Sequence, residues 1–225
     1  MVLSGCEERL SALHPAGPAA RNIATIWWVL LAGATVIFLF VMALLAAALL
    51  RRREKPAQDG APQNGPPRDG ASEKVWFWGL GLAFPAVTLA TLTAYGLMMG
   101  ERLLPRMSPE VVTVGAEGRQ WAWTFRYADA PGRATEGVLH IPAGRPVDVE
   151  ITSADVLHSF WVPRLAGKLD AIPGHVNVLR IEAETPGDYA GVSSEYNGPG
   201  YRDHAFTVRA LDADGWTTFL AGAQP

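Results

Sequence analysis

The chain has 225 residues, of which 49% are hydrophobic and only 18% are charged, below the roughly 25% typical of soluble domains. The formal net charge is −3 and the basic residues form no continuous stripe, which argues against a nucleic-acid-binding protein. The single cysteine excludes an intramolecular disulfide framework, and it excludes any site in this chain that needs two thiolates.

Two long uncharged segments dominate the first hundred residues. Residues 23–50 and 75–100 contain no Asp, Glu, Lys, Arg or His. As a helix the first segment reaches about 42 Å, more than the ~30 Å hydrocarbon core of a bilayer. The alternative, two core helices of a soluble protein, is disfavoured by this length and by the absence of charge. We therefore predict two transmembrane helices, the second with a kink at Pro85.

The charged flanks of these helices predict their orientation. Lys and Arg are more numerous in residues 51–74 than in residues 1–22, so the positive-inside rule places the connecting loop in the cytoplasm. The loop is rich in Pro and Gly, which is typical of a flexible connector. The predicted organisation is an outer N-terminal segment (1–22), a first span (23–50), a cytoplasmic loop (51–74), a second span (75–100) and an outer domain (101–225).

The outer domain reads as a series of short strands between turn signals. The predicted strands cover residues 111–114, 120–127, 146–152, 156–162, 176–182, 188–192 and 205–210. Seven short strands at this spacing indicate a β-sandwich or a barrel. A short helix is predicted for residues 212–223, with Asp212 or Asp214 as its N-cap.

Three motifs in this domain carry a family resemblance. They are residues 118–123 (GRQWAW), 155–163 (DVLHSFWVP) and 168–174 (KLDAIPG). In this order, behind two spans, they resemble subunit II of the haem–copper oxidases, over a region from about Leu3 to Trp216. The resemblance implies a two-helix transmembrane hairpin plus an all-β, cupredoxin-like sandwich. It also implies a bacterial inner membrane, a periplasmic sandwich and docking on a large catalytic subunit I.

The chain departs from this family at its copper site. In the cytochrome c oxidases the domain holds a dinuclear CuA centre, whose ligands are two His, two Cys, a Glu and a Met. The chain plainly keeps His158, while Ser193 and Asn197 replace the two Cys. The second His corresponds to Tyr201 or to His204. Ser and Asn are weak, hard ligands for copper, so we expect neither a CuA centre nor a mononuclear blue-copper site.

The loss of the two Cys also changes the roles expected of the other positions around the copper site. If His204 is the second His, the Met position is Thr207. His158 is expected to be a packed or hydrogen-bonded histidine, the alternative being adventitious metal on His158 and His204. Trp121 matches a family residue at which cytochrome c delivers its electron, but packing is the expected role of Trp121 and Trp123 when no copper lies behind them.

A subunit II without copper ligands resembles that of the bo-type quinol oxidases, as does the Gly-Pro-Gly turn at residues 198–200. This implies a non-catalytic subunit, without a cofactor of its own, in a complex that oxidises ubiquinol, reduces oxygen to water and pumps protons. The haems and CuB would lie in subunit I, which would also bind the quinol, and further membrane subunits are expected. One alternative is a CuA-less subunit of a cytochrome c-linked oxidase, favoured by His158 and residues 170–174. Another is a free-standing, membrane-anchored, cupredoxin-like assembly or binding module.

Three further residues are candidates through the same resemblance. Cys6 fits a lipobox, where bacteria acylate an N-terminal cysteine, but few residues precede it for a signal peptide, so either translation starts upstream or Cys6 is unmodified. Glu73 is a candidate for proton entry, or it simply complements the macrodipole at a helix start. Glu195 corresponds to a family Glu that helps to hold an interface Mg²⁺, a cation that prefers oxygen ligands. Its alternative is an ion pair at the rim.

Overall fold

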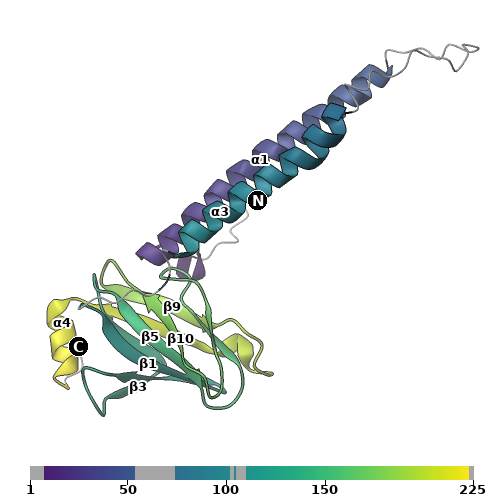
Figure 1. The fold of residues 1–225 in the computed structure, drawn as a ribbon. Coiled ribbons are helices and arrows are strands. Elements are labelled where there is room, and N and C mark those ends of the chain that lie inside the picture. Colours follow the sequence, from purple (N-terminus) through teal and green to yellow (C-terminus); the bar gives the residue numbers. More distant parts are fainter. Residues whose placement is uncertain (1–7, 54–73, 102–103, 105–109, 223–225) are drawn as a thin grey trace, which may run out of the picture. The chain divides into compact units, whose positions relative to one another are not determined.

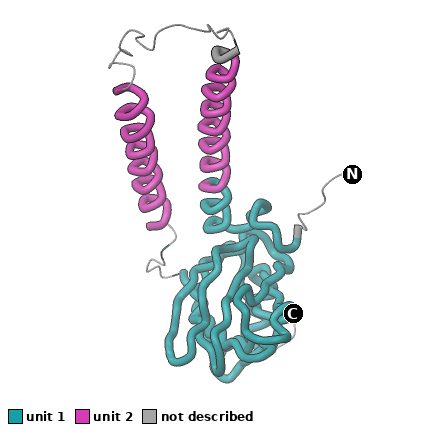
Figure 2. Tube along the Cα trace, turned by 90° about the vertical axis from the view of Figure 1, so that its right-hand side faces the viewer, with its two compact units in different colours: residues 1–25, 103–225 teal, residues 26–102 magenta. Residues whose placement is uncertain are grey.

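The computed structural model describes residues 8–53, 74–101, 104 and 110–222. The chain forms two compact units, one made of Met1–Thr25 with Leu103–Pro225 and the other of Ile26–Arg102 (Figure 2). The first unit therefore joins the N-terminal segment to the β domain, and the second unit holds most of the helical hairpin.

The helical unit consists of long apolar helices. Helix α1 covers Pro18–Arg53, the π-helix η2 covers Val75–Ala83 and helix α3 covers Phe84–Glu101. Both candidate spans are long and apolar enough to cross a membrane, and no residue of their most apolar windows is buried. Helices in the core of a soluble protein are mostly buried, so the exposure of these two helices argues against that alternative.

The second apolar helix changes its geometry next to Pro85. The backbone N–H of Phe84 donates to the carbonyl of Gly79, five residues earlier, and regular α-helix begins at Phe84. Proline has no N–H to donate and its ring crowds the carbonyl four residues before it. A wider π-helical turn relieves this crowding. The predicted interruption at Pro85 thus takes the form of a π-helix that ends just before the proline.

The β domain is a sandwich of two five-stranded sheets (Figure 1). Its strands are β1 Val112–Arg119, β2 Ala122–Tyr127, β3 Ala134–Glu136, β4 Val138–Pro142, β5 Val147–Ser153, β6 His158–Trp161, β7 Leu169–Ala171, β8 Asn177–Ile181, β9 Gly187–Ser193 and β10 Ala205–Leu211. One sheet has the order β3-β2-β1-β5-β8 and the other has the order β4-β10-β9-β6-β7. The predicted fold class, a helical hairpin plus an all-β sandwich, is confirmed.

The core lies between the two sheets because apolar residues alternate along the strands. In β1 and β5 the inward residues pair across the sheet, as Val112 with Val147 and Val114 with Val149. The opposite sheet contributes aromatic side chains such as Phe160. Each fully buried side chain of this size contributes about 1.5–3 kcal/mol. The predicted strands correspond to seven of these elements, whereas β3, β4 and β7 were not predicted.

The N-terminal segment, with the 3-10 helix η1 (Glu8–Leu10), packs on the β domain within the same unit. The backbone N–H of Ala16 donates to Arg164 O at 2.7 Å, and the N–H of Glu184 donates to Ala16 O at 3.0 Å. Ala20 is buried, and Arg21 forms an ion pair with Glu184. A Cβ at Gly17 would lie 2.0 Å from the Glu182 carbonyl oxygen, so this contact requires glycine.

Helix α4 (Ala213–Leu220) closes the chain and packs Trp216 and Phe219 against the core. Its N-cap is Asp212, whose Oδ1 accepts from the N–H of Gly215 at 2.8 Å. Of the two caps expected from the sequence, the structure therefore selects Asp212.

Removing this cap should have a measurable cost. We expect Asp212→Ala to lower the free energy of unfolding by about 1 kcal/mol, because one N–H of the first turn loses its acceptor. Urea unfolding of the full chain in detergent, followed by tryptophan fluorescence, would measure the loss. Asp214→Ala, which removes an acidic residue from the same first turn but not the cap, is the matched control. Equal losses in both variants would contradict the assignment of the cap.

His140 is buried under α4 and should make the stability of the domain depend on pH. Its ring stacks on Phe219 at 4.5 Å between centroids. Burial lowers the pKa of His140, and the nearby Arg209 and Arg133 lower it further. The unfolded chain, with a His pKa of about 6.5, then binds more protons than the folded chain below that pH. Stability should therefore fall as the pH is lowered from about 7.5 to 5.

The measurement is the urea midpoint at several pH values for the wild-type chain and for His140→Gln. The variant should show a smaller drop between pH 7.5 and 5, because one of the groups that titrates in this window is gone. Carboxylates with lowered pKa, such as Asp188, lose their contribution at lower pH and do not interfere. An unchanged pH dependence in the variant would show that His140 is not the group responsible.

Candidate functional site

One end of the sandwich holds a buried polar cluster. Strand β6 supplies His158, the end of β9 supplies Ser193, and the loop that follows supplies Asn197 and His204. Their exposed fractions are 0% for His158, 5% for Ser193, 5% for Asn197 and 1% for His204. The structure thus brings together four of the residues singled out from the sequence.

The side-chain amide of Asn197 lies at the centre of this cluster. Its Nδ2 is 2.7 Å from His158 Nδ1, 2.9 Å from His204 Nδ1 and 3.3 Å from Ser193 Oγ. The two imidazole rings are 5.2 Å apart between centroids. An amide –NH₂ group has two hydrogens, so Asn197 can hold both rings through their Nδ1 atoms.

The proton on His158 is fixed by its second partner. His158 Nε2 lies 2.7 Å from Asp155 Oδ1, and a carboxylate can only accept. Nε2 therefore carries the proton, which leaves Nδ1 as the acceptor for Asn197. Burial disfavours the ionised form of Asp155, but the bonds from the Gln120 N–H, His158 and the Val156 N–H outweigh it and lower its pKa to about 2. Asp155 is thus an anion that orients the ring.

The structure places His204, and not Tyr201, in the cluster. Tyr201 belongs to the 3-10 helix η3 (Tyr201–Asp203) and its ring packs near that of Tyr196, with 5.3 Å between centroids. Burial lowers the pKa of His204, and the neighbouring His158 lowers it further. A neutral His204 suits a ring that accepts a hydrogen bond at Nδ1. Thr207 lies on β10, away from these rings, and lines a groove described below.

Two tryptophans of residues 118–123 border the cluster in different ways. Trp123 is fully buried and stacks on His204 with 5.7 Å between centroids. Trp121 is 42% exposed, and Cβ atoms at Gly198 and Gly200 would come within 2.7 Å and 2.8 Å of its ring. The Gly-Pro-Gly turn therefore leaves room for one side of the Trp121 indole at the surface, whereas Trp123 is part of the core.

The donor atoms present do not fit a CuA centre. Copper in such a site needs soft thiolates, and the positions between the two imidazoles are taken by the Ser193 hydroxyl and the Asn197 amide. The amide presents hydrogens, not lone pairs, to the volume where a metal would sit. Within residues 8–53, 74–101, 104 and 110–222 there is no group of three or more His, Cys, Asp and Glu side chains that could hold a metal ion.

Of the other three candidates, only Glu195 lies among the described residues. Glu195 lies in the same loop, where Lys168 Nζ is 3.5 Å from its Oε2 and both side chains are partly exposed. This is the rim ion pair named as the alternative to Mg²⁺ binding. Cys6 and Glu73, the candidate lipid anchor and proton entry, lie outside the described residues.

Sequence reasoning missed the residues that fasten the loops around the cluster. Gln120 donates from its backbone to Asp155 Oδ2 at 2.8 Å and from Nε2 to the Asn197 carbonyl at 2.5 Å. Two buried polar atoms of the cluster, Asn197 Oδ1 and His204 Nε2, lack a partner in hydrogen-bond geometry, as does Nε1 of the neighbouring Trp123. No signal in the sequence singles out Gln120, because the residue is exposed and its partners lie on loops that only the folded structure brings together.

Comparisons with known proteins agree with this architecture. Residues 133–211 match the family described as cytochrome c oxidase subunit II, periplasmic domain. The chain is 32% identical to the ubiquinol oxidase subunit 2 of Acetobacter aceti over 98% of this chain and 71% of that protein. It is 31% identical to the cytochrome c oxidase subunit 2 of Alkalihalophilus pseudofirmus over 99% of this chain, and spans 65% of that relative's length.

Among solved structures, the periplasmic domain of subunit II of cytochrome oxidase from Bradyrhizobium japonicum matches with a TM-score of 0.49 and 25% identity. The match covers 53% of this chain and 95% of that one. Two membrane-length helices and a β-sandwich are the architecture of a membrane-anchored subunit with a β domain. On the sequence matches to both kinds of oxidase, the chain belongs to subunit II of the haem–copper oxidases.

Proposed function

We propose that this chain is the subunit II of a haem–copper quinol oxidase and carries no redox centre of its own. The observation that supports this most directly is the Asn197 amide, which bonds both buried imidazoles at Nδ1 where copper would need thiolates. An electron from cytochrome c would find no acceptor in this domain. A quinol, in contrast, would deliver its electrons within the membrane part of the complex.

The work of the chain is then structural. The sandwich would dock on subunit I, which would hold the haems and CuB, and the hairpin would pack in the bilayer beside it. We place the sandwich in the periplasm and the 51–74 loop in the cytoplasm, as the positive-inside rule indicates. The complex would oxidise quinol, reduce oxygen to water and pump protons, as oxidases of the bo type do.

The minor sites remain part of this proposal. Glu195 would contact an interface Mg²⁺ only if the cation displaced Lys168 and drew further oxygen ligands from subunit I. Glu73 would sit at a cytoplasmic proton entry, and Cys6 would add a lipid anchor beside the first span. Loss of lipid mass in a Cys6→Ser variant would test the last of these.

The decisive experiment uses the purified complex that contains this chain. We expect no CuA near-infrared absorption, no copper beyond that of the haem–copper centre, and oxygen uptake driven by ubiquinol but not by reduced cytochrome c. Additional copper together with a CuA band would mean that the loop around Asn197 binds metal in the assembled complex, and it would overturn the proposal.

A cytochrome c-linked oxidase without CuA is a second candidate, because the relative from Alkalihalophilus pseudofirmus is a cytochrome c oxidase subunit 2 and His158 is kept. In that case reduced cytochrome c would support turnover without a CuA signal, through a c-type haem elsewhere in the complex. The same oxygen-uptake assay separates the two. A free-standing module would purify without any haem subunit.

A further inference from the structure

The two outer faces of the sandwich differ in chemistry. The outer face of β1 and β2 carries charged side chains in ion pairs, such as Arg126 with Glu117. The outer face of β9 and β10 carries one such pair, Asp188 with Arg209, but next to it presents small, uncharged residues in two cross-strand pairs, Val192 with Ala205 and Ala190 with Thr207. A solvated sheet face normally carries charged or large polar side chains, so this face is suited to an apolar occupant.

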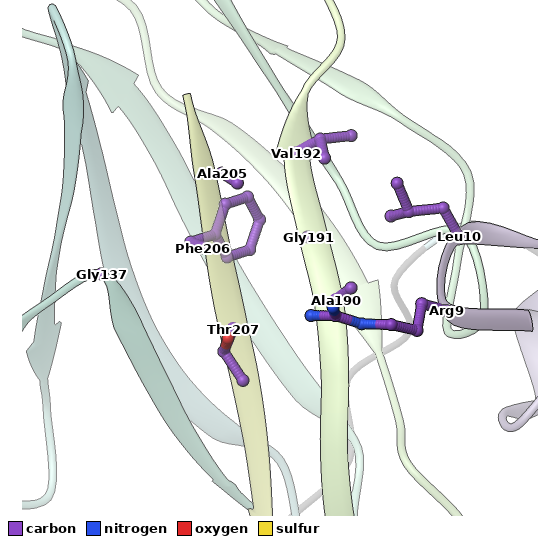
Figure 3. Close-up of a pocket in the computed structure, with 9 residues that line it drawn as sticks. All are labelled: Arg9, Leu10, Gly137, Ala190, Gly191, Val192, Ala205, Phe206 and Thr207. Atoms are coloured by element: carbon purple, nitrogen blue, oxygen red, sulfur yellow. The ribbon is translucent and has the colours of Figure 1, made fainter. Parts of the chain in front are cut away.

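The N-terminal segment turns this face into a groove (Figure 3). Arg9 and Leu10 of η1 form one wall, and Figure 3 shows the Arg9 side chain reaching across Ala190 of β9. The groove has a volume of about 330 Å³, within the range of pockets that hold small ligands. Its floor is formed by residues 190–192 of β9 and 205–207 of β10.

One end of the groove is cationic. An adjoining cavity of about 230 Å³ shares Arg9 with the groove and adds Arg164 and Asp188. The Asp188 carboxylate is already held by Arg209, with Nε and Nη2 at 2.8 Å and 2.9 Å from its two oxygens. Its negative charge is therefore balanced and does not neutralise the other two arginines.

The two remaining guanidinium groups are available to an anion. Arg9 forms no ion pair with any side chain that the structure describes. Arg164 donates from Nε to the His14 carbonyl at 3.0 Å and lies over the Tyr189 ring at 5.5 Å, contacts that leave its terminal nitrogens unpaired with a carboxylate among the described residues. Guanidinium groups bind phosphate through paired, charge-assisted hydrogen bonds.

We propose that this groove binds an anionic phospholipid. The phosphate would lie between Arg9 and Arg164, and the first part of an acyl chain would lie over Ala190, Val192 and Ala205. A phospholipid suits the site better than a free anion because the cationic end opens onto an apolar groove. Such lipids are also within reach, since the chain from Arg9 to the start of α1 at Pro18 spans at most about 30 Å.

The test is photo-crosslinking of the full chain in nanodiscs of phosphatidylcholine. One set of discs contains a small fraction of a phosphatidylglycerol probe with a diazirine in its acyl chain. A parallel set contains instead a phosphatidylcholine probe with the same diazirine acyl chain. After irradiation, lipid adducts are quantified on the tryptic peptides 181–202 and 203–209, which contain β9 and most of β10. We expect the phosphatidylglycerol probe to label these peptides, and the phosphatidylcholine probe to label them about tenfold less.

Two sets of variants test the two halves of the site. The double variant Arg9→Gln/Arg164→Gln, which removes the cationic end, should reduce the labelling about tenfold. The variant Ala205→Phe should block the labelling because the phenyl ring fills the groove. Arg119→Gln with Arg126→Gln, on the other outer face, is the matched control and should leave it unchanged. Tryptophan fluorescence would verify that each variant is folded.

Three results would overturn the proposal: equal labelling by both probes in the wild-type chain, labelling in the arginine variant equal to that of its control, or full displacement of the lipid by millimolar inorganic phosphate. The last would reveal a simple anion site. None of these outcomes depends on the donor of electrons to the oxidase, so they leave the proposed function untouched.

Discussion

Replacing Trp123 with alanine should lower the free energy of unfolding of the β domain by about 4 kcal/mol, within the range for buried aromatic residues. The indole is fully buried and packs against His158, Phe160, His204 and Phe206. Its removal would leave a cavity between the two sheets that these rings cannot close. Urea unfolding of the full chain in detergent would measure the loss.

Trp121→Ala is the matched control, because it removes the same side chain two residues earlier at a position that is 42% exposed. We expect a loss of about 1 kcal/mol or less for this variant, since much of the ring already contacts solvent. Similar losses for the two variants would contradict the view that Trp123 is a core residue and Trp121 a surface residue.

Asn197→Leu should destabilise the same domain by about 3 kcal/mol, although leucine has a similar size. The substitution removes the donor that both His158 and His204 use at Nδ1, and each buried acceptor left without a partner costs about 1–3 kcal/mol. Because His158 remains held by Asp155, its ring cannot easily turn to find another donor.

Asn177→Leu provides the comparison for this variant. Asn177 is less buried and donates a single bond from Nδ2, to the Asp170 carbonyl at 2.7 Å, so its replacement should cost about 1 kcal/mol. The difference between the two variants would measure the worth of the bridge between the imidazoles. If Asn197→Leu cost no more than Asn177→Leu, the histidines would not depend on the amide.

The sequence predicted the overall architecture because its strongest signals are compositional. Two uncharged segments and a series of alternating strands lead directly to a hairpin and a sandwich. The strands that escaped prediction give weak signals: β3 and β7 have three residues each, too short for alternation to show, and β4 ends at Pro142. The docking of the N-terminal segment was missed because its backbone bonds, such as Ala16 to Arg164, leave no trace in residue type.

The residues of the candidate site were also predictable only in part. His158, Ser193 and Asn197 could be found because a resemblance fixes their order along the chain. The choice between Tyr201 and His204 depends on which side chain the turn at η3 directs inward, and the spacing of the residues does not determine this. Gln120 and Asp155, which fasten two loops to the cluster, are recognisable only once those loops are seen to meet.

The contacts between the first residues and the β domain also constrain how the chain is threaded through a membrane. Ala16 bonds to Arg164 and Arg21 pairs with Glu184, so residues that precede and residues that follow the two apolar helices in the sequence belong to one compact unit. A polypeptide that leaves a folded body and comes back to it crosses a bilayer an even number of times. If both apolar helices span the bilayer, as proposed, these contacts can form only after residues 164–184 have been delivered to the side that holds the first residues, which makes closure of this body a late event in membrane insertion.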